Sequence, residues 1–79
     1  MKQPHSVVPL GKLRAGETAV IVDLEKGDLA LKLMEMGLLP GEKIFVDMVA
    51  PLGDPISIKI GNYLLSLRKE EANAVLVRR

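Results

Sequence analysis

The chain contains no cysteine among its 79 residues. Disulfide bonds, thiolate zinc sites and thiol catalysis are therefore excluded, and a small domain without such cross-links is compatible with a reducing cytoplasm. Long apolar runs are missing too, because no stretch free of Asp, Glu, Lys and Arg exceeds nine residues. A membrane-spanning helix needs about 20 apolar residues and a signal peptide needs an apolar core, so neither fits. We therefore expect a cytoplasmic protein without a membrane span.

Aromatic residues make up only 3% of the chain, although its hydrophobic content is 48%. Aliphatic side chains must therefore fill the core, which favours a small β-rich barrel. An excess of one charge is also missing, because 11 basic and 10 acidic residues are interspersed and give a pI near 8.1. Domains that bind nucleic acid usually carry a clustered basic stripe and a pI above about 9, so we expect no nucleic-acid partner.

A chain of this length can build one small core. A domain of 79 residues buries about 60% of the surface of its unfolded chain and has little stability to spare. We predict a single domain over residues 1–79. Residues 1–6 show no periodic pattern, and we expect them to be flexible.

Residues 28–36 predict a short amphipathic helix. Asp28 is a suitable N-cap, and apolar residues recur on one helical face at Leu29, Leu33 and Met36. Gly37, followed by Leu38, predicts a Schellman cap. In residues 39–42, Leu-Pro-Gly-Glu, proline presets the first central position of a type II turn and glycine supplies the positive φ of the second. The helix is therefore expected to end in a fixed elbow over residues 37–41.

Alternating apolar residues predict the strands. One spans residues 18–24 and a second spans 43–50. In the second we expect the core face to consist of Ile44, Val46, Met48 and Ala50. Phe45 lies on its other face, either under the helix elbow or in an exposed apolar patch.

The dipeptide Gly61-Asn62 predicts a β-hairpin with a two-residue turn. Such a turn fixes the register of the two strands. The expected pairs are Ile60 with Tyr63, Ile58 with Leu65 and Ile56 with Leu67 on the inner side, and Ser57 with Ser66 and Lys59 with Leu64 outside.

The remaining segments complete the predicted order of secondary-structure elements. Residues 7–13 predict a short extended piece and a tight turn, residues 68–72 a single helical turn, and residues 74–77 a closing strand. Five short strands with a helical turn before the last are typical of an SH3-like barrel. The predicted fold is therefore mainly β, a small five-stranded SH3-like barrel with one short helix between the first two strands.

No catalytic constellation is visible in the sequence. The only histidine, His5, has no plausible partner, and Ser57 and Ser66 are expected to pair across the hairpin. Capping and solvation explain the nearby carboxylates Asp23, Glu25 and Asp28. Transition-metal sites with open positions usually need several converging His and carboxylate ligands. We therefore predict a binding module and not an enzyme, without a cofactor and with at most weak binding of Fe²⁺ or Zn²⁺.

Two stiff loops carry apolar side chains where loops are usually polar. One is the elbow, and the other is residues 51–55, Pro-Leu-Gly-Asp-Pro. The predicted protein-binding surface consists of six residues from these loops: Leu38, Leu39, Pro40, Leu52, Gly53 and Asp54. An architectural interpretation stays open, because a cap and a turn account for the glycines and proline of the elbow, and Leu52 can fold back over the barrel mouth.

Several short motifs follow one another along the chain: Met36-Gly37-Leu38-Leu39-Pro40-Gly41, Ala50-Pro51-Leu52-Gly53-Asp54-Pro55, then Gly61, Leu65-Ser66-Leu67-Arg68 and Glu71-Ala72. Together they resemble the ferrous iron transport protein A family over nearly the whole chain. The resemblance implies a cytoplasmic SH3-like domain that works beside the ferrous iron permease, protein B, whose cytoplasmic part carries a GTPase-like domain.

Two functions follow as hypotheses. In the first, the protein is an accessory and regulatory protein of ferrous iron uptake that docks on the GTPase-like region of the permease through the apolar loops. In the second, it is a free-standing transition-metal sensor akin to the C-terminal SH3-like domain of iron-dependent repressors. Open β edges and the outward-facing Leu64 leave a homo-oligomer open as well.

Overall fold

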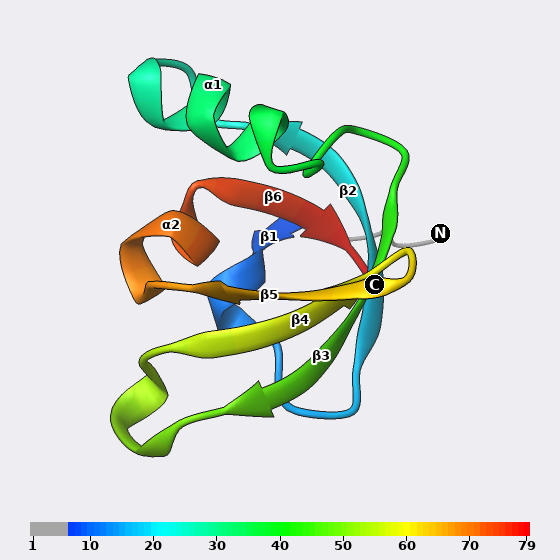
Figure 1. The fold of residues 1–79 in the computed structure, drawn as a ribbon, viewed down its shortest axis with the longest axis vertical. Coiled ribbons are helices and arrows are strands. Elements are labelled where there is room, and N and C mark those ends of the chain that lie inside the picture. Colours follow the sequence, from blue (N-terminus) through cyan, green and yellow to red (C-terminus); the bar gives the residue numbers. More distant parts are fainter. Residues whose placement is uncertain (1–6) are drawn as a thin grey trace, which may run out of the picture.

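Six strands form one antiparallel sheet in the order β1-β6-β2-β3-β4-β5 (Figure 1). The computed structural model describes residues 7–79, so the expectation of a flexible segment at 1–6, with His5, lies outside the described residues. The elements in chain order are β1 (Val7–Pro9), the 3₁₀ turn η1 (Leu10–Lys12), β2 (Thr18–Leu24), α1 (Asp28–Glu35), β3 (Lys43–Val49), the turn η2 (Pro51–Gly53), β4 (Ile56–Ile60), β5 (Tyr63–Leu67), α2 (Lys69–Asn73) and β6 (Val75–Arg78).

The mainly β fold is confirmed, with one strand more than predicted. The additional strand is β1, the extended piece at the start of residues 7–13, which pairs antiparallel with β6. It is an edge strand of the sheet. Pro9 is tolerated there because an edge strand can leave one side of its backbone without ladder hydrogen bonds. Neither helix within residues 7–79 is long and apolar enough to cross a membrane.

Aliphatic side chains fill the core, as the low aromatic content predicts. The sheet contributes buried residues from each of the strands β2 to β6, the helix α1 contributes Ala30 and Leu33, and η1 contributes Leu10. The fully buried members of the sheet include Ile21, Ile44, Val46, Ile56, Ile58, Leu67, Val75 and Val77. The opposite, outer face of the sheet is therefore the one that meets solvent.

The hairpin of β4 and β5 has the predicted register. Ile60 pairs with Tyr63, Ile58 with Leu65, and Ile56 with Leu67. The two outer pairs, Ser57 with Ser66 and Lys59 with Leu64, are confirmed as well. A two-residue turn leaves no freedom in the pairing of the strands that it joins, which is why the sequence alone determines this part.

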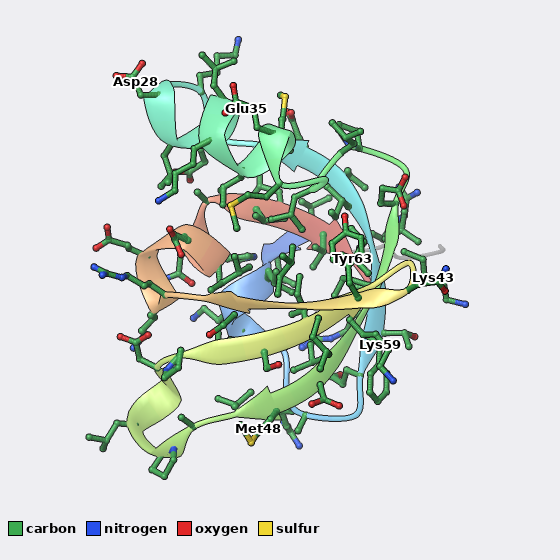
Figure 2. The ribbon with its side chains drawn as sticks, viewed as in Figure 1. Asp28, Glu35, Lys43, Met48, Lys59 and Tyr63 are labelled. Carbon is green, nitrogen blue, oxygen red and sulfur yellow. The ribbon has the colours of Figure 1, made fainter. Side chains whose placement is uncertain are left out.

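The prediction that Met48 lies in the core is wrong. A register shift between Val46 and Met48 interrupts the pairing of β3 with β4. An extra residue at such a bulge turns the following side chains to the other face of the sheet. Met48 is therefore 56% exposed and points away from the sheet in Figure 2, whereas Val49 packs partly against the core. The strand also ends at Val49, one residue before the predicted end.

The predicted N-cap of the helix is wrong, whereas the predicted C-cap is confirmed. Asp28 is the first helical residue and Gly27 occupies the N-cap position. At the other end, the Gly37 amide donates to the Met34 carbonyl at 2.9 Å and the Leu38 amide donates to the Leu33 carbonyl at 3.1 Å. These two bonds define a Schellman motif, and Gly37 has the positive φ, +101°, that the motif requires.

Candidate protein-binding site

The structure places the two predicted loops at opposite ends of the molecule. Figure 1 shows the elbow after α1 at the upper right and η2 at the lower left. The elbow is fixed to the sheet, because the Gly41 amide donates to the Ile21 carbonyl at 2.7 Å and the Glu42 amide closes the predicted turn on the Leu39 carbonyl at 3.1 Å. The six predicted residues therefore do not form one continuous surface.

Leu38 cannot contact a partner in this structure, so its assignment to the binding surface is corrected. Its side chain has no exposed area and belongs to the same core cluster as Leu33. The hydrophobic contact that accompanies a Schellman motif joins these two helix positions, which explains the burial of Leu38. Leu39 is 44% exposed and Pro40 is exposed, so these two elbow residues can still meet a partner.

Leu52 is the most exposed large apolar residue of the described chain, at 97%. It occupies the second central position of a turn that the Gly53 amide closes on the Ala50 carbonyl at 2.8 Å. Its φ of 71° and ψ of 7° are those of a type II turn, which favours glycine or asparagine at this position. Leu52 is the only residue other than glycine with a positive φ in residues 7–79.

The exposure of Leu52 rules out the interpretation in which it folds back over the barrel mouth. A branched apolar residue in the left-handed region is destabilising by about 1–2 kcal/mol. No burial within the described chain compensates for that strain, because the side chain meets almost no protein atoms. Such uncompensated features gather at functional sites. Leu52 is therefore the strongest candidate contact residue of the molecule.

The base of this loop is held rigidly. The Ala50 amide donates to the Pro55 carbonyl at 3.0 Å. The carboxylate of Asp54 accepts a hydrogen bond from the Lys69 amide at 3.0 Å, which attaches the loop to the first residue of α2. Asp54 thus has a structural role, and the contribution of Gly53 and Asp54 to partner binding stays a prediction. Because the base is fixed, a contact made by Leu52 would cost little loop entropy.

The carboxylates Asp23, Glu25 and Asp28 do not converge on a metal site. All three side chains are exposed, and Asp23 accepts a hydrogen bond from the Leu24 amide at 2.8 Å. Over residues 7–79, no group of three or more His, Cys, Asp or Glu side chains has a geometry that could hold a metal ion.

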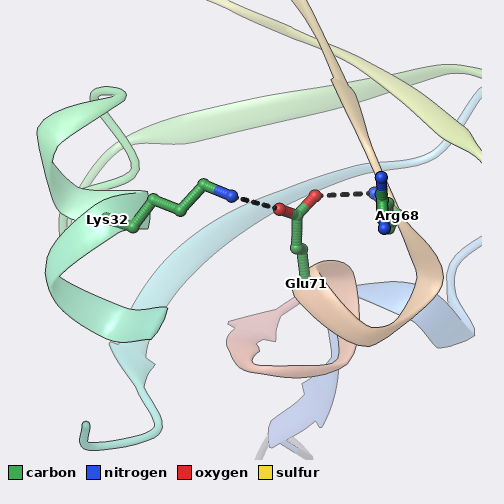
Figure 3. Close-up of polar contacts among 3 residues, drawn as sticks. All are labelled: Lys32, Arg68 and Glu71. Carbon is green, nitrogen blue, oxygen red and sulfur yellow. Dashed lines mark hydrogen bonds and ion pairs between the residues drawn. The ribbon is translucent and has the colours of Figure 1, made fainter. Parts of the chain in front are cut away.

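One buried carboxylate was missed by the sequence analysis. Glu71 is only 8% exposed, accepts a hydrogen bond from the Arg68 amide at 2.8 Å, and meets the Lys32 ammonium at 3.1 Å (Figure 3). The hydrogen bond from the Arg68 amide is the main reason why the pKa of Glu71 is below its usual value. The Lys32 ammonium lowers this pKa as well, whereas burial acts in the opposite direction. Arg68 and Glu71 have the spacing of a capping box. That spacing is the signal in the sequence that could have identified the hydrogen bond from the Arg68 amide to Glu71.

Phe45 lies half-buried on the outer face of β3. The Lys59 ammonium is 5.9 Å from the centroid of its ring, within the range of a cation–π contact. The sequence left two environments open for Phe45, and the structure supports the partly exposed one.

Comparisons with known protein sequences point to one family. The FeoA domain family matches residues 8–79. A Fe(2+) transport protein A/Fe(2+) transporter FeoB fusion protein of Porphyromonas gingivalis is 41% identical over 69 residues, which are 86% of this chain and 8% of that protein. The chain therefore spans less than a tenth of the length of that curated relative.

Solved structures with this fold include members of the same family. Iron(II) transport protein A of Clostridium thermocellum is 49% identical with a TM-score of 0.82, over 90% of this chain and 44% of that one. FeoA of Stenotrophomonas maltophilia, complexed with zinc and described as an SH3 domain protein, is 27% identical with a TM-score of 0.76 and 86% coverage of both chains. A manganese-dependent transcriptional repressor shares the fold alone, at 19% identity and a TM-score of 0.82, over 96% of this chain and 41% of that one. Since the family match includes 8–79, this chain belongs to the FeoA domain family of ferrous iron transport.

Proposed function

We propose that this protein is a non-enzymatic accessory protein of ferrous iron uptake. It docks on the cytoplasmic, GTPase-like region of the ferrous iron permease, and the tip of η2 is the main contact. The fusion of a transport protein A to a FeoB transporter in Porphyromonas gingivalis supports this partner. Linking two binding modules in one chain raises their effective concentration, which is useful only when the two modules work together.

The single observation that carries the proposal is the state of Leu52, which is exposed at 97% in a backbone conformation that disfavours leucine. Burying a leucine side chain against a partner contributes about 1.5–3 kcal/mol, or roughly 10-fold to 100-fold in affinity. Leu39 and Pro40 lie at the far end of the molecule, so they form a second, separate contact or none.

Binding of the full-length protein to the permease in nanodiscs tests the proposal. We expect saturable binding, which Leu52→Glu weakens at least about tenfold, because it places a charge in an apolar contact. Leu39→Glu, measured in parallel, reports whether the elbow takes part. Leu31→Glu is the matched control, since Leu31 is also exposed, at 61%, but lies on α1.

The outcome decides between two clear cases. Failure of the wild-type protein to bind the permease, with or without GTP, overturns the proposed function. Binding that Leu52→Glu leaves unchanged overturns the role of the η2 tip. Circular dichroism of each variant establishes that it is folded before its affinity is compared.

The alternative function, a free-standing transition-metal sensor, has less support. The likeness to a metal-dependent repressor concerns the fold, and the bound zinc belongs to the Stenotrophomonas maltophilia protein. In the part of this chain that the structure describes, no suitable group of ligands is present. Self-association through the open edges of β1 and β5 stays a prediction.

A further inference from the structure

A row of cross-strand pairs runs over the outer face of the sheet at its hairpin end. Leu64 of β5 pairs with Lys59 of β4, Lys59 with Phe45 of β3, and Phe45 with Thr18 of β2. Directly paired residues share one face of a sheet. Their neighbours along the strands, such as Ile44, are buried in the core, so this row faces outward.

A second row lies beside the first. Lys43 of β3 pairs with Val20 of β2, and Val20 pairs with Arg78 of β6. Lys43 and Arg78 are exposed, and Val20 is half-buried between them. The two rows together place three cations, Lys43, Lys59 and Arg78, on one face with apolar side chains among them.

An open hollow lies along the first row and reaches Lys43 of the second. It has a volume of about 310 Å³ and is lined by Thr18, Lys43, Ile44, Phe45, Lys59 and Gly61. A second hollow of about 490 Å³ shares Lys59 and Gly61 with it and reaches Tyr63 and Leu64. Figure 2 shows Lys43 and Lys59 toward the right-hand side of the molecule. Lys59 therefore stands at the boundary of two adjoining hollows.

The three cations of this face have no acidic partner in the described part of the chain. The ion pairs of residues 7–79 are Lys32 with Glu71 and Arg79 with Glu17. Glu17, which precedes Thr18, is thus engaged elsewhere. Glu42 and Asp47 are exposed neighbours along the chain, but neither lines the hollows. Lysines are therefore the only charged residues that line the two hollows.

Exposed lysines on a sheet are often only solvated, but the apolar residues here argue for more. Phe45 forms a half-buried floor under the Lys59 ammonium, 5.9 Å from the ring centroid. Leu64, which is 55% exposed, lies on the opposite side of Lys59 from Phe45. A hollow with an apolar floor and a cationic rim is complementary to a carboxylate that stands next to an apolar side chain.

We infer that this outer-face hollow binds an acidic segment of the partner protein, one with a carboxylate beside an apolar side chain. The carboxylate lies between the ammonium groups of Lys43 and Lys59, and the apolar neighbour packs on Phe45 and Leu64. The inference rests on the proposed function, because the partner is the same permease. It adds a charged contact to the apolar one made by Leu52.

The test is the affinity of the Lys43→Glu/Lys59→Glu double variant for the permease in nanodiscs of neutral lipid. The matched control is Lys12→Glu/Lys26→Glu, which changes the net charge by the same amount at two exposed lysines outside the hollow. We expect the first pair to weaken binding at least about tenfold at low salt and the control by less than about twofold. The difference should shrink when the salt is raised from roughly 20 mM to 500 mM, because screening weakens contacts between exposed charges.

Each result has a distinct meaning. If the wild-type protein binds and Leu52→Glu weakens it, but the two double variants bind equally, only the acidic-segment inference is overturned. If the wild-type protein does not bind, the proposed function itself fails. Vesicles of phosphatidylglycerol and phosphatidylcholine supply the last arm. Sedimentation of the wild-type protein with them, lost in Lys43→Glu/Lys59→Glu, would assign the hollow to lipid headgroups and overturn the inference as well.

Discussion

The ammonium group of Lys32 on α1 lies 3.1 Å from the carboxylate of Glu71 on α2, and this contact joins two helices that are 39 positions apart in the sequence. Glu71 is the only charged residue buried within residues 7–79. Its other oxygen accepts the hydrogen bond from the Arg68 amide at the start of α2. One side chain thus both caps α2 and connects α1 to it.

Glu71→Gln should lower the free energy of unfolding by about 1 kcal/mol, because a hydrogen bond to a charged group is replaced by a neutral one. The effect is limited by the exposure of Lys32, whose side chain is 62% accessible and therefore partly screened. Glu70→Gln, one residue away on the exposed side, is the matched control. Urea denaturation of both variants measures the difference, and equal stabilities would show that the contact has no energetic role.

Stability should fall in acid, partly through Glu71. Its pKa in the folded protein is lower than its ordinary value of 4.5, so the unfolded chain binds the proton more readily. The stabilisation from Glu71 is therefore complete above that ordinary value and is lost as the pH falls through the lower folded pKa. The pKa of Glu17 is also lowered, first by its bond from the Arg14 amide.

Thermal denaturation between pH 3 and 7 checks this dependence. Glu71→Gln should flatten the acid limb of the curve relative to the wild-type protein, and Glu70→Gln should leave the limb unchanged. A wild-type curve that stays level below the ordinary glutamate pKa would contradict the assignment.

Gly37→Ala should destabilise the protein more than Gly41→Ala. Both glycines have a positive φ, +101° and +95°, so both variants introduce similar backbone strain of about 1 kcal/mol. An added Cβ at Gly37 would also lie 2.5 Å from the Tyr63 hydroxyl oxygen, whereas nothing lies within 4 Å at Gly41. Urea denaturation measures both variants. In a Tyr63→Phe background the difference between them should shrink, and a difference that persists would place its cause elsewhere.

Calorimetric titration with Fe²⁺ or Zn²⁺ under anaerobic conditions should give at most weak binding, because no ligand cluster occurs in the described residues 7–79. Asp23→Asn should leave the result unchanged, since the Asp23 carboxylate is exposed and accepts the Leu24 amide. Tight one-to-one binding that is lost in His5→Ala or Asp23→Asn would contradict the expectation and favour the metal sensor.

Features set by residues close in sequence could be predicted. The Gly61-Asn62 turn determines every pair of the β4–β5 hairpin, and the glycine at position 37 determines the Schellman cap, because each depends on a few local backbone angles. The family resemblance was likewise carried by local motifs, and the FeoA domain match confirms it.

Features set by distant residues could not be predicted. The bulge that exposes Met48 depends on how β3 pairs with β4, and alternation along one strand does not encode it. The contact between Lys32 and Glu71 joins two helices across most of the domain. The separation of the elbow from η2 depends on the path of the sheet, so the similar composition of the two loops does not show that they lie at opposite ends of the molecule.

Leu52→Asn tests the central claim most directly, because stability and binding should move apart. Asparagine tolerates a positive φ better than leucine, and Leu52 has almost no burial to lose, so the melting temperature should stay level or rise by several degrees. Affinity for the permease should fall at least about tenfold, because the apolar contact is gone. Unchanged affinity, or a fall that accompanies a loss of stability, would contradict the claim that Leu52 is held outside the fold for a partner.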